Sequence, residues 1–265
     1  MYAFDYHRPN SVSEAASLLQ GNDEAKLLAG GMTYIPTLKQ RLAQPSDVID
    51  LGAIADLRRI FVDRGSQLVV GAMATHAEVA RSAEVRATIP AVASLAEHIG
   101  DAQVRNRGTI GGSIANNDPA ADYPGAVLGL NARVVTNRRE IAADDFFTGM
   151  FDTALEDEEI IVEVRFPKPE RAAYLKFPNP ASRYALVGVM VAQTGGETRV
   201  AVTGASTCVF RVPEYEQALA SNFSADALNG VSARFPDLNS DLHASADYRA
   251  HLIKVMAQRA LKAAS

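Results

Sequence analysis

Cys208 is the single cysteine of the 265-residue sequence. One thiol excludes an intramolecular disulfide, a Cys-x-x-Cys redox pair and an iron–sulfur cluster held by this chain. Long apolar runs are also missing. None approaches the ~20 residues of a transmembrane helix, and the first residues lack the basic and apolar regions of a secretory signal. We therefore expect a cytoplasmic chain that does not insert into a membrane.

Excess positive charge is absent as well. The formal net charge is −5, and Lys and Arg are scattered along the chain, so a nucleic-acid interface is not expected. Apolar residues make up 48% of the sequence, which is enough for a substantial core. At this length we expect two or three packed units.

Two common nucleotide-binding motifs are missing. No Gly-x-Gly occurs, which excludes the Rossmann fingerprint, and no Gly-x-x-x-x-Gly-Lys occurs, which excludes a P-loop. The chain has instead a first glycine segment (residues 27–34, Leu-Leu-Ala-Gly-Gly-Met-Thr-Tyr) and a second glycine segment (residues 109–113, Thr-Ile-Gly-Gly-Ser). The simplest nucleotide site would therefore combine two separate segments.

Both glycine segments have the chemistry of an anion site. Adjacent glycines let the backbone turn with φ > 0 and leave its amides open, and each charge-assisted hydrogen bond to a phosphate contributes about 1.5–3 kcal/mol. Asp122, thirteen residues after Thr109, suits a donor such as a ribose or ribityl hydroxyl. The alternative is an ordinary Gly-Gly turn followed by an Asp-Pro loop.

Together the two segments resemble one family, the FAD-binding (medium) subunits of the molybdenum hydroxylases, which include carbon monoxide, xanthine and aldehyde dehydrogenases. The resemblance covers nearly the whole chain and is strongest from Leu27 to Pro124. It implies an α+β fold with a two-lobed FAD-binding domain of the PCMH (vanillyl-alcohol-oxidase-like) type. A C-terminal antiparallel sheet backed by helices should follow. The expected limits are 1–52 and 53–168 for the two lobes and 169–265 for the C-terminal domain.

The resemblance also implies which residues hold noncovalent FAD. They are Leu28, Ala29, Gly30, Gly31, Met32, Thr33, Tyr34 and Ile35 in the first glycine segment and just after it, Thr109, Ile110, Gly111, Gly112 and Ser113 in the second, and Ile99, Asp122, Ile161, Lys176 and Tyr184 elsewhere. We expect Lys176 near the N1–C2=O edge of the flavin, where a cation favours the anionic reduced form. A solvated lysine is the alternative. Tyr184 follows Ser-Arg, where relatives usually have an acidic residue before the tyrosine.

By resemblance, the substrate is oxidised at a molybdopterin centre in a large partner subunit. Electrons then pass through a small partner with two [2Fe–2S] clusters to the FAD of this chain, which hands them to an external acceptor. The complex would be a dimer of heterotrimers. Two rival functions remain, a standalone FAD-dependent dehydrogenase or reductase and a non-catalytic nucleotide-binding module.

Local patterns predict several elements. Ser11-Val-Ser-Glu14 and Thr75-His-Ala-Glu78 have the spacing of a capping box, and each should begin a short helix. We expect a helix over 34–42, a hairpin from strands 60–62 and 68–71, and an edge or half-buried strand over 160–166. Gly195-Gly196 should join two strands, and helices should cover 225–228 and 246–264.

Other polar residues receive structural interpretations. The acidic run Glu156-Asp-Glu-Glu159 is typical of a solvated turn. His76 and His98 are expected to be surface or hydrogen-bonded side chains, because no metal-ligand spacing surrounds them. Arg105 and Arg107 are assigned structural or partner contacts rather than flavin contacts.

Overall fold

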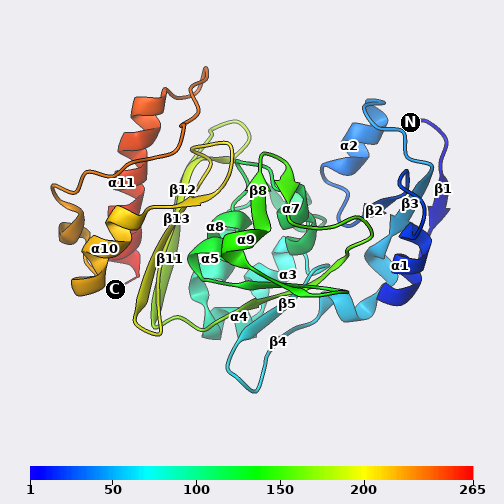
Figure 1. Cartoon of the computed structure of the whole chain (residues 1–265), viewed down its shortest axis with the longest axis horizontal. Coiled ribbons are helices and arrows are strands. Elements are labelled where there is room, and N and C mark those ends of the chain that lie inside the picture. Colours follow the sequence, from blue (N-terminus) through cyan, green and yellow to red (C-terminus); the bar gives the residue numbers. More distant parts are fainter. Residues whose placement is uncertain (265) are drawn as a thin grey trace.

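The chain is arranged as three units along its longest axis (Figure 1). The computed structural model describes residues 1–264 and contains four sheets. The N-terminal lobe lies at one end, a larger lobe in the middle and the C-terminal sheet at the other, so the two ends of the chain lie far apart. The predicted α+β class is confirmed. Among residues 1–264, no helix is both long and apolar enough to cross a bilayer.

The N-terminal lobe is a small parallel sheet of order β1-β3-β2 with short helices. Its elements are β1 (Asp5–His7), α1 (Val12–Leu19), β2 (Lys26–Leu28), α2 (Tyr34–Lys39), β3 (Asp47–Asp50), η1 (Leu51–Ala53) and η2 (Ala55–Arg58). Ser11 begins α1 by accepting a hydrogen bond from Glu14 N, as its spacing predicts. Helix α2 ends at Lys39 rather than at Leu42, which is 74% exposed and has no core to face.

The central lobe is a five-stranded antiparallel sheet of order β4-β5-β10-β6-β7 with helices and a small hairpin. Its elements are β4 (Ile60–Val62), β5 (Leu68–Gly71), α3 (His76–Arg81), α4 (Ala83–Thr88), α5 (Pro90–Glu97), α6 (Ala102–Arg105), α7 (Ile110–Asn116), α8 (Tyr123–Gly129), β6 (Arg133–Thr136), β7 (Glu140–Ala142), α9 (Ala143–Phe146), β8 (Phe147–Gly149), β9 (Asp152–Thr153) and β10 (Ile161–Phe166). The predicted β4–β5 hairpin is confirmed.

Strand β10 decides between the two alternatives that the sequence leaves open: it is half-buried, with both buried and partly exposed residues, and it does not lie at an edge. It pairs with β5 on one side and β6 on the other, so it is the middle strand of the sheet and not an edge strand. Val164 and Phe166 are fully buried. The alternation of its residues predicts a strand, but position in the sheet depends on pairing with strands far away in the sequence.

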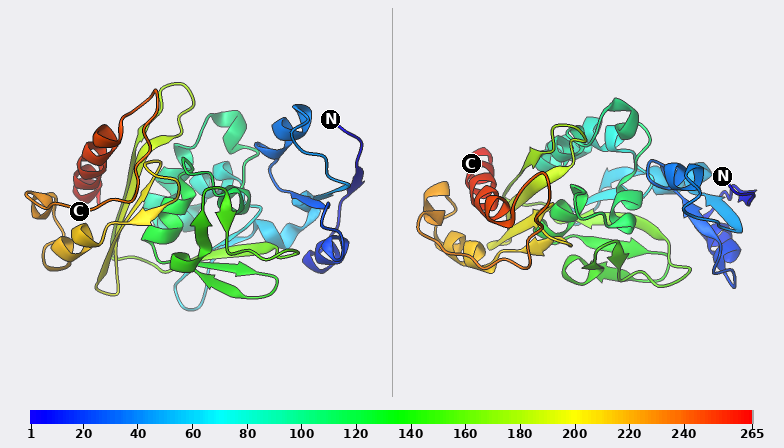
Figure 2. Two further views of the ribbon diagram at one scale, coloured as in Figure 1. Left: turned by 45° about the horizontal axis from the view of Figure 1, so that its top comes forward. Right: turned by 90° about the horizontal axis from the view of Figure 1, so that it is seen from above.

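The C-terminal unit is the predicted antiparallel sheet backed by helices. Its elements are β11 (Arg171–Pro178), β12 (Ala185–Thr194), β13 (Glu197–Thr203), β14 (Phe210–Arg211), α10 (Pro213–Ser221), η3 (Ala225–Leu228) and α11 (Ala246–Ala263). Helices α10 and α11 cover its outer face, and α5 and α8 pack against the inner face (Figures 1 and 2). Gly195 and Gly196, with φ of +59° and +81°, form the predicted turn. Residues 225–228 form a 3₁₀ turn rather than an α-helix.

Candidate functional site

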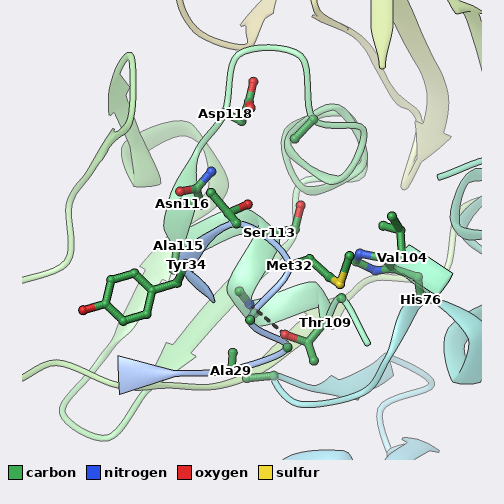
Figure 3. A pocket seen from close by; sticks show the side chains of 18 of the residues that line it. Ala29, Met32, Tyr34, His76, Val104, Thr109, Ser113, Ala115, Asn116 and Asp118 are labelled. Carbon is green, nitrogen blue, oxygen red and sulfur yellow. Dashed lines mark hydrogen bonds between the residues drawn. The ribbon is translucent and has the colours of Figure 1, made fainter. Parts of the chain in front are cut away.

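A cavity of about 640 Å³ lies where the three units meet, within the range typical of ligand sites. The N-terminal lobe contributes the loop between β2 and α2, the central lobe contributes α7, and the connection from β11 to β12 contributes Ser182, Arg183 and Tyr184. The predicted site residues that line it are Ala29, Gly30, Gly31, Met32, Thr33, Tyr34, Ile99, Thr109, Gly111, Gly112, Ser113, Asp122, Ile161 and Tyr184. Figure 3 shows part of this wall, with Thr109 between Tyr34 and His76.

Four predicted site residues lie behind the wall. The side chains of Leu28 and Ile35 pack beneath Gly31, where they occupy the space that a Cβ would need. Ile110 is fully buried in the core of the central lobe. Lys176 has only 8% of its side chain exposed and lies behind Asp122. These residues support the cavity from behind.

The first glycine segment packs against the second segment and against the backbone just before it. A Cβ at Gly30 would lie 2.1 Å from the carbonyl oxygen of Arg107, and a Cβ at Gly112 would lie 3.2 Å from Cβ of Ala29. Since real Cβ atoms do not approach backbone oxygen so closely, only glycine fits at position 30. The convergence that the sequence predicts is therefore present.

The first glycine segment leaves its backbone donors unpaired. Gly31 has φ of +74°, and the consecutive N–H groups from Gly30 to Tyr34 make no hydrogen bond within the described residues. Thr33 begins α2 without a side-chain cap bond. Adjacent unpaired N–H groups favour an anion, so this segment has the chemistry that the sequence predicts.

The second glycine segment differs from its prediction. It is no turn with φ > 0, because Gly111 and Gly112 lie in the first turn of α7. Their amides are already bonded: Gly111 N donates to Ala72 O at 2.8 Å, and Gly112 N donates to Thr109 Oγ1 at 3.1 Å. A Cβ at Gly111 would lie 2.7 Å from Ala72 O. These glycines therefore serve close packing more than anion binding.

Asp122 is a buried carboxylate at the cavity wall, with 4% of its surface exposed. Tyr174 Oη donates to its Oδ1 at 2.6 Å, and Lys176 Nζ lies 3.0 Å from Oδ1 and 3.1 Å from Oδ2. Burial raises the pKa of Asp122, and the Lys176 ammonium and the Tyr174 hydroxyl oppose that rise. Two of the roughly four lone-pair sites of the carboxylate remain for a hydroxyl donor.

Glu159 and His76 also line the cavity, and the sequence interpretation missed both. The Glu159 side chain is 0% exposed, not solvated. Burial raises its pKa, but hydrogen bonds from Arg139, Glu156 N and Thr136 outweigh it and lower the pKa to about 2. His76 is 5% exposed, and its ring makes no hydrogen bond within the described residues, so it is neither a surface nor a hydrogen-bonded histidine.

Arg105 has the structural role that the sequence suggests. Its Nη1 donates to the carbonyls of Ile99 and Gly100, which fixes a turn that lines the cavity. Arg107 lines a smaller pocket of about 210 Å³, which Gly30 also lines. Within residues 1–264, no group of three or more His, Cys, Asp or Glu side chains is arranged to hold a metal ion.

Comparisons with known proteins agree with this arrangement. Residues 2–169 match the family described as the FAD binding domain in molybdopterin dehydrogenase. The chain is 37% identical to the nicotine 6-hydroxylase medium subunit of Paenarthrobacter nicotinovorans, over 98% of this chain and 96% of that protein. It is also 37% identical to the carbon monoxide dehydrogenase medium chain of Hydrogenophaga pseudoflava, with the same coverage.

Solved structures give the same result. A carbon monoxide dehydrogenase structure from Hydrogenophaga pseudoflava matches with a TM-score of 0.87 and 37% identity, over 99% of this chain and 97% of that one. Quinoline 2-oxidoreductase from Pseudomonas putida 86 matches with a TM-score of 0.83 and 30% identity, over 99% and 97%. The chain therefore belongs to the family of FAD-binding medium subunits of molybdopterin dehydrogenases, which are subunits of oxidoreductase complexes.

Proposed function

We propose that this chain binds FAD noncovalently in the cavity between its lobes and serves as the electron-output subunit of a molybdenum hydroxylase complex in the cytoplasm. One observation carries the proposal: unpaired amides from Gly30 to Tyr34 meet the second glycine segment at a cavity large enough for a nucleotide cofactor. The match of residues 2–169 to an FAD-binding family supports it.

The residues present fit the cofactor. The unpaired amides of the first glycine segment suit an anionic diphosphate. The Asp122 carboxylate suits ribityl or ribose hydroxyls, which donate hydrogen bonds to it. Cys208 is not among the residues that line the cavity, which supports noncovalent binding.

The protein's own contribution is binding, orientation and electrostatics. FAD, when bound, supplies the exchange between single electrons and electron pairs. The Lys176 ammonium at 3.0 Å favours the ionised form of Asp122 and so opposes the rise that burial causes in the pKa of this carboxyl. No general base is required for electron transfer, and we assign none.

Partners complete the proposal. We infer that a small subunit with two [2Fe–2S] clusters supplies electrons and that a large molybdopterin subunit oxidises the substrate. Relatives named as medium chains or complex subunits support this assignment. The assembly we propose is a dimer of heterotrimers, and the acceptor is external to it.

The test begins with the complex in which the full chain purifies. We expect a yellow protein that releases one FAD per chain into the supernatant on acid precipitation. Flavin that stays with the precipitated chain would contradict noncovalent binding. A colourless protein that does not bind added FAD would contradict the proposal and favour the rival function, a non-catalytic nucleotide-binding module.

A second measurement tests the direction of electron flow. Addition of the oxidisable substrate to the complex should bleach the iron–sulfur and flavin absorption together, whereas the isolated chain should not turn over that substrate. Turnover by the isolated chain would favour a standalone dehydrogenase.

A further inference from the structure

His76 forms part of the cavity wall, yet the assignments above give it no role. It lines the cavity together with Met32 and Val104, which Figure 3 labels with it. Its Nδ1 is buried, and neither ring nitrogen has a hydrogen-bond partner within the described residues. Nε2, unlike Nδ1, is not fully covered by protein atoms, so it is the ring nitrogen that a ligand in the cavity can reach. Polar atoms at such a depth are normally paired, so its open hydrogen bond points to a ligand that completes it.

The ring has little freedom to turn elsewhere for a partner. His76 is the first residue of α3, and its backbone N donates to Gly108 O at 2.9 Å. A Cβ at Gly108 would lie 2.5 Å from His76 Nε2, and the Tyr123 ring packs on the other side at 5.4 Å between centroids. The imidazole therefore packs against both Gly108 and Tyr123.

The charge state of the ring decides which ligand groups it suits. Burial, and secondarily the nearby Arg105, lower the pKa of His76 to about 4. At neutral pH the imidazole is therefore uncharged, with one donor and one acceptor nitrogen. A diphosphate would favour a cation, whereas a hydroxyl can both donate and accept and so matches either tautomer.

We propose that His76 is a further cofactor-binding residue and that its imidazole shares a hydrogen bond with a ribityl hydroxyl. The inference rests on the proposed function, because it requires FAD in this cavity. It adds a neutral contact to the anion-binding amides and the Asp122 carboxylate.

The experiment compares His76→Phe, which keeps a ring but loses both nitrogens, with His76→Gln, which keeps a donor and an acceptor. His251→Phe on the exposed side of α11 is the matched control. Titration of the deflavinated full chain, in the complex with which it purifies, should give an about tenfold weaker FAD Kd for His76→Phe. His76→Gln should stay within about threefold of wild type, and ADP affinity should not change.

The spectrum separates the ribityl group from the ring system. A lost ribityl contact leaves the absorption maxima of bound flavin unchanged, and a shift of those maxima in His76→Phe would overturn the assignment. An unchanged FAD Kd, or a parallel loss of ADP affinity, would also overturn it. Absence of FAD binding in wild type would instead remove the proposed function itself.

A measurement on the wild-type chain covers the case in which the variants do not fold. Ring ¹⁵N shifts of labelled histidine report hydrogen bonding directly. Resonances of the buried neutral His76 should move when FAD is added and stay in place when ADP is added. Resonances that ignore FAD would overturn the inference.

Discussion

The two glycine segments are similar in sequence and different in structure. Both contain Gly-Gly near a small hydroxyl residue, but only the first has a residue at positive φ, Gly31, and unpaired amides from Gly30 to Tyr34. The second begins α7, where the amides of Gly111 and Gly112 are already bonded. A Gly-Gly pair therefore indicates close backbone approach, and only the surrounding structure decides whether its N–H groups are open.

The largest predicted effect comes from a substitution that disrupts the contact of the first glycine segment with the backbone just before the second. In Gly30→Ala the new Cβ would lie 2.1 Å from Arg107 O, a backbone atom that cannot move alone. We expect a loss of about 3 kcal/mol or more in the free energy of unfolding, measured by urea denaturation. Gly149→Ala is the control, because its Cβ would meet nothing closer than 3.8 Å. Equal stability of the two variants would mean that the segments are not in contact.

The second predicted effect is a pH dependence of folding stability that arises from His76, a titratable residue beside the second glycine segment. His76 packs against Gly108, just before the second segment, and its pKa is lowered to about 4. In the unfolded chain the histidine binds a proton near its ordinary pKa of ~6.5, whereas in the folded chain it does so only near pH 4. Between these pH values protonation favours the unfolded state, so the free energy of unfolding is highest above about pH 6.5 and decreases as the pH falls toward 4. The loss should reach up to about 3 kcal/mol.

Denaturation of wild type and His76→Gln at pH values of about 7.5 and 4.5 isolates this contribution, since other acids titrate equally in both. Wild type should lose more stability than the variant. Equal losses would mean that His76 is not buried in its neutral form.

The third prediction separates packing from binding. Gly111→Ala should cost about 2 kcal/mol of folding stability through contact with Ala72, while FAD affinity of the folded protein changes little. Gly31→Ala should cost about 1–2 kcal/mol, because φ of +74° disfavours a Cβ, and should also weaken FAD about tenfold by moving the open amides. A reversed pattern of affinities would assign the anion to α7 instead.

The smallest effect concerns the hydroxyl residues. Thr109 Oγ1 caps α7, so Thr109→Val should cost about 1 kcal/mol. Thr33 makes no side-chain cap bond to α2, so Thr33→Val should leave the free energy of unfolding unchanged. Thermal unfolding of both variants tests the difference, and a similar loss in both would show that the segments are equivalent.

The sequence predicts what depends on neighbours in the chain. Ser11 caps α1, Gly195-Gly196 joins β12 to β13, and Thr75 with Glu78 forms a capping box, because each depends on a few consecutive residues. The family resemblance locates the cavity for the same reason, since its glycine motifs are local.

What the sequence misses depends on distant contacts. The pair of Lys176 with Asp122 joins residues 54 positions apart, so no local pattern predicts that Lys176 is held by this carboxylate. We expect removal of Asp122 to destabilise the fold, because it would leave the Lys176 ammonium buried without a counter-charge. The burial of His76 and Glu159 likewise follows from packing that no local pattern encodes.

The backbone contact between Gly30 and Arg107 has one more consequence. This contact joins the N-terminal and central lobes through protein atoms alone. The two walls of the cavity that these lobes form therefore do not need a ligand to bring them together. Preorganisation of this kind spares association the entropic cost of ordering loops, and more of the contact energy then becomes affinity. The free and loaded chains should share one arrangement of the lobes.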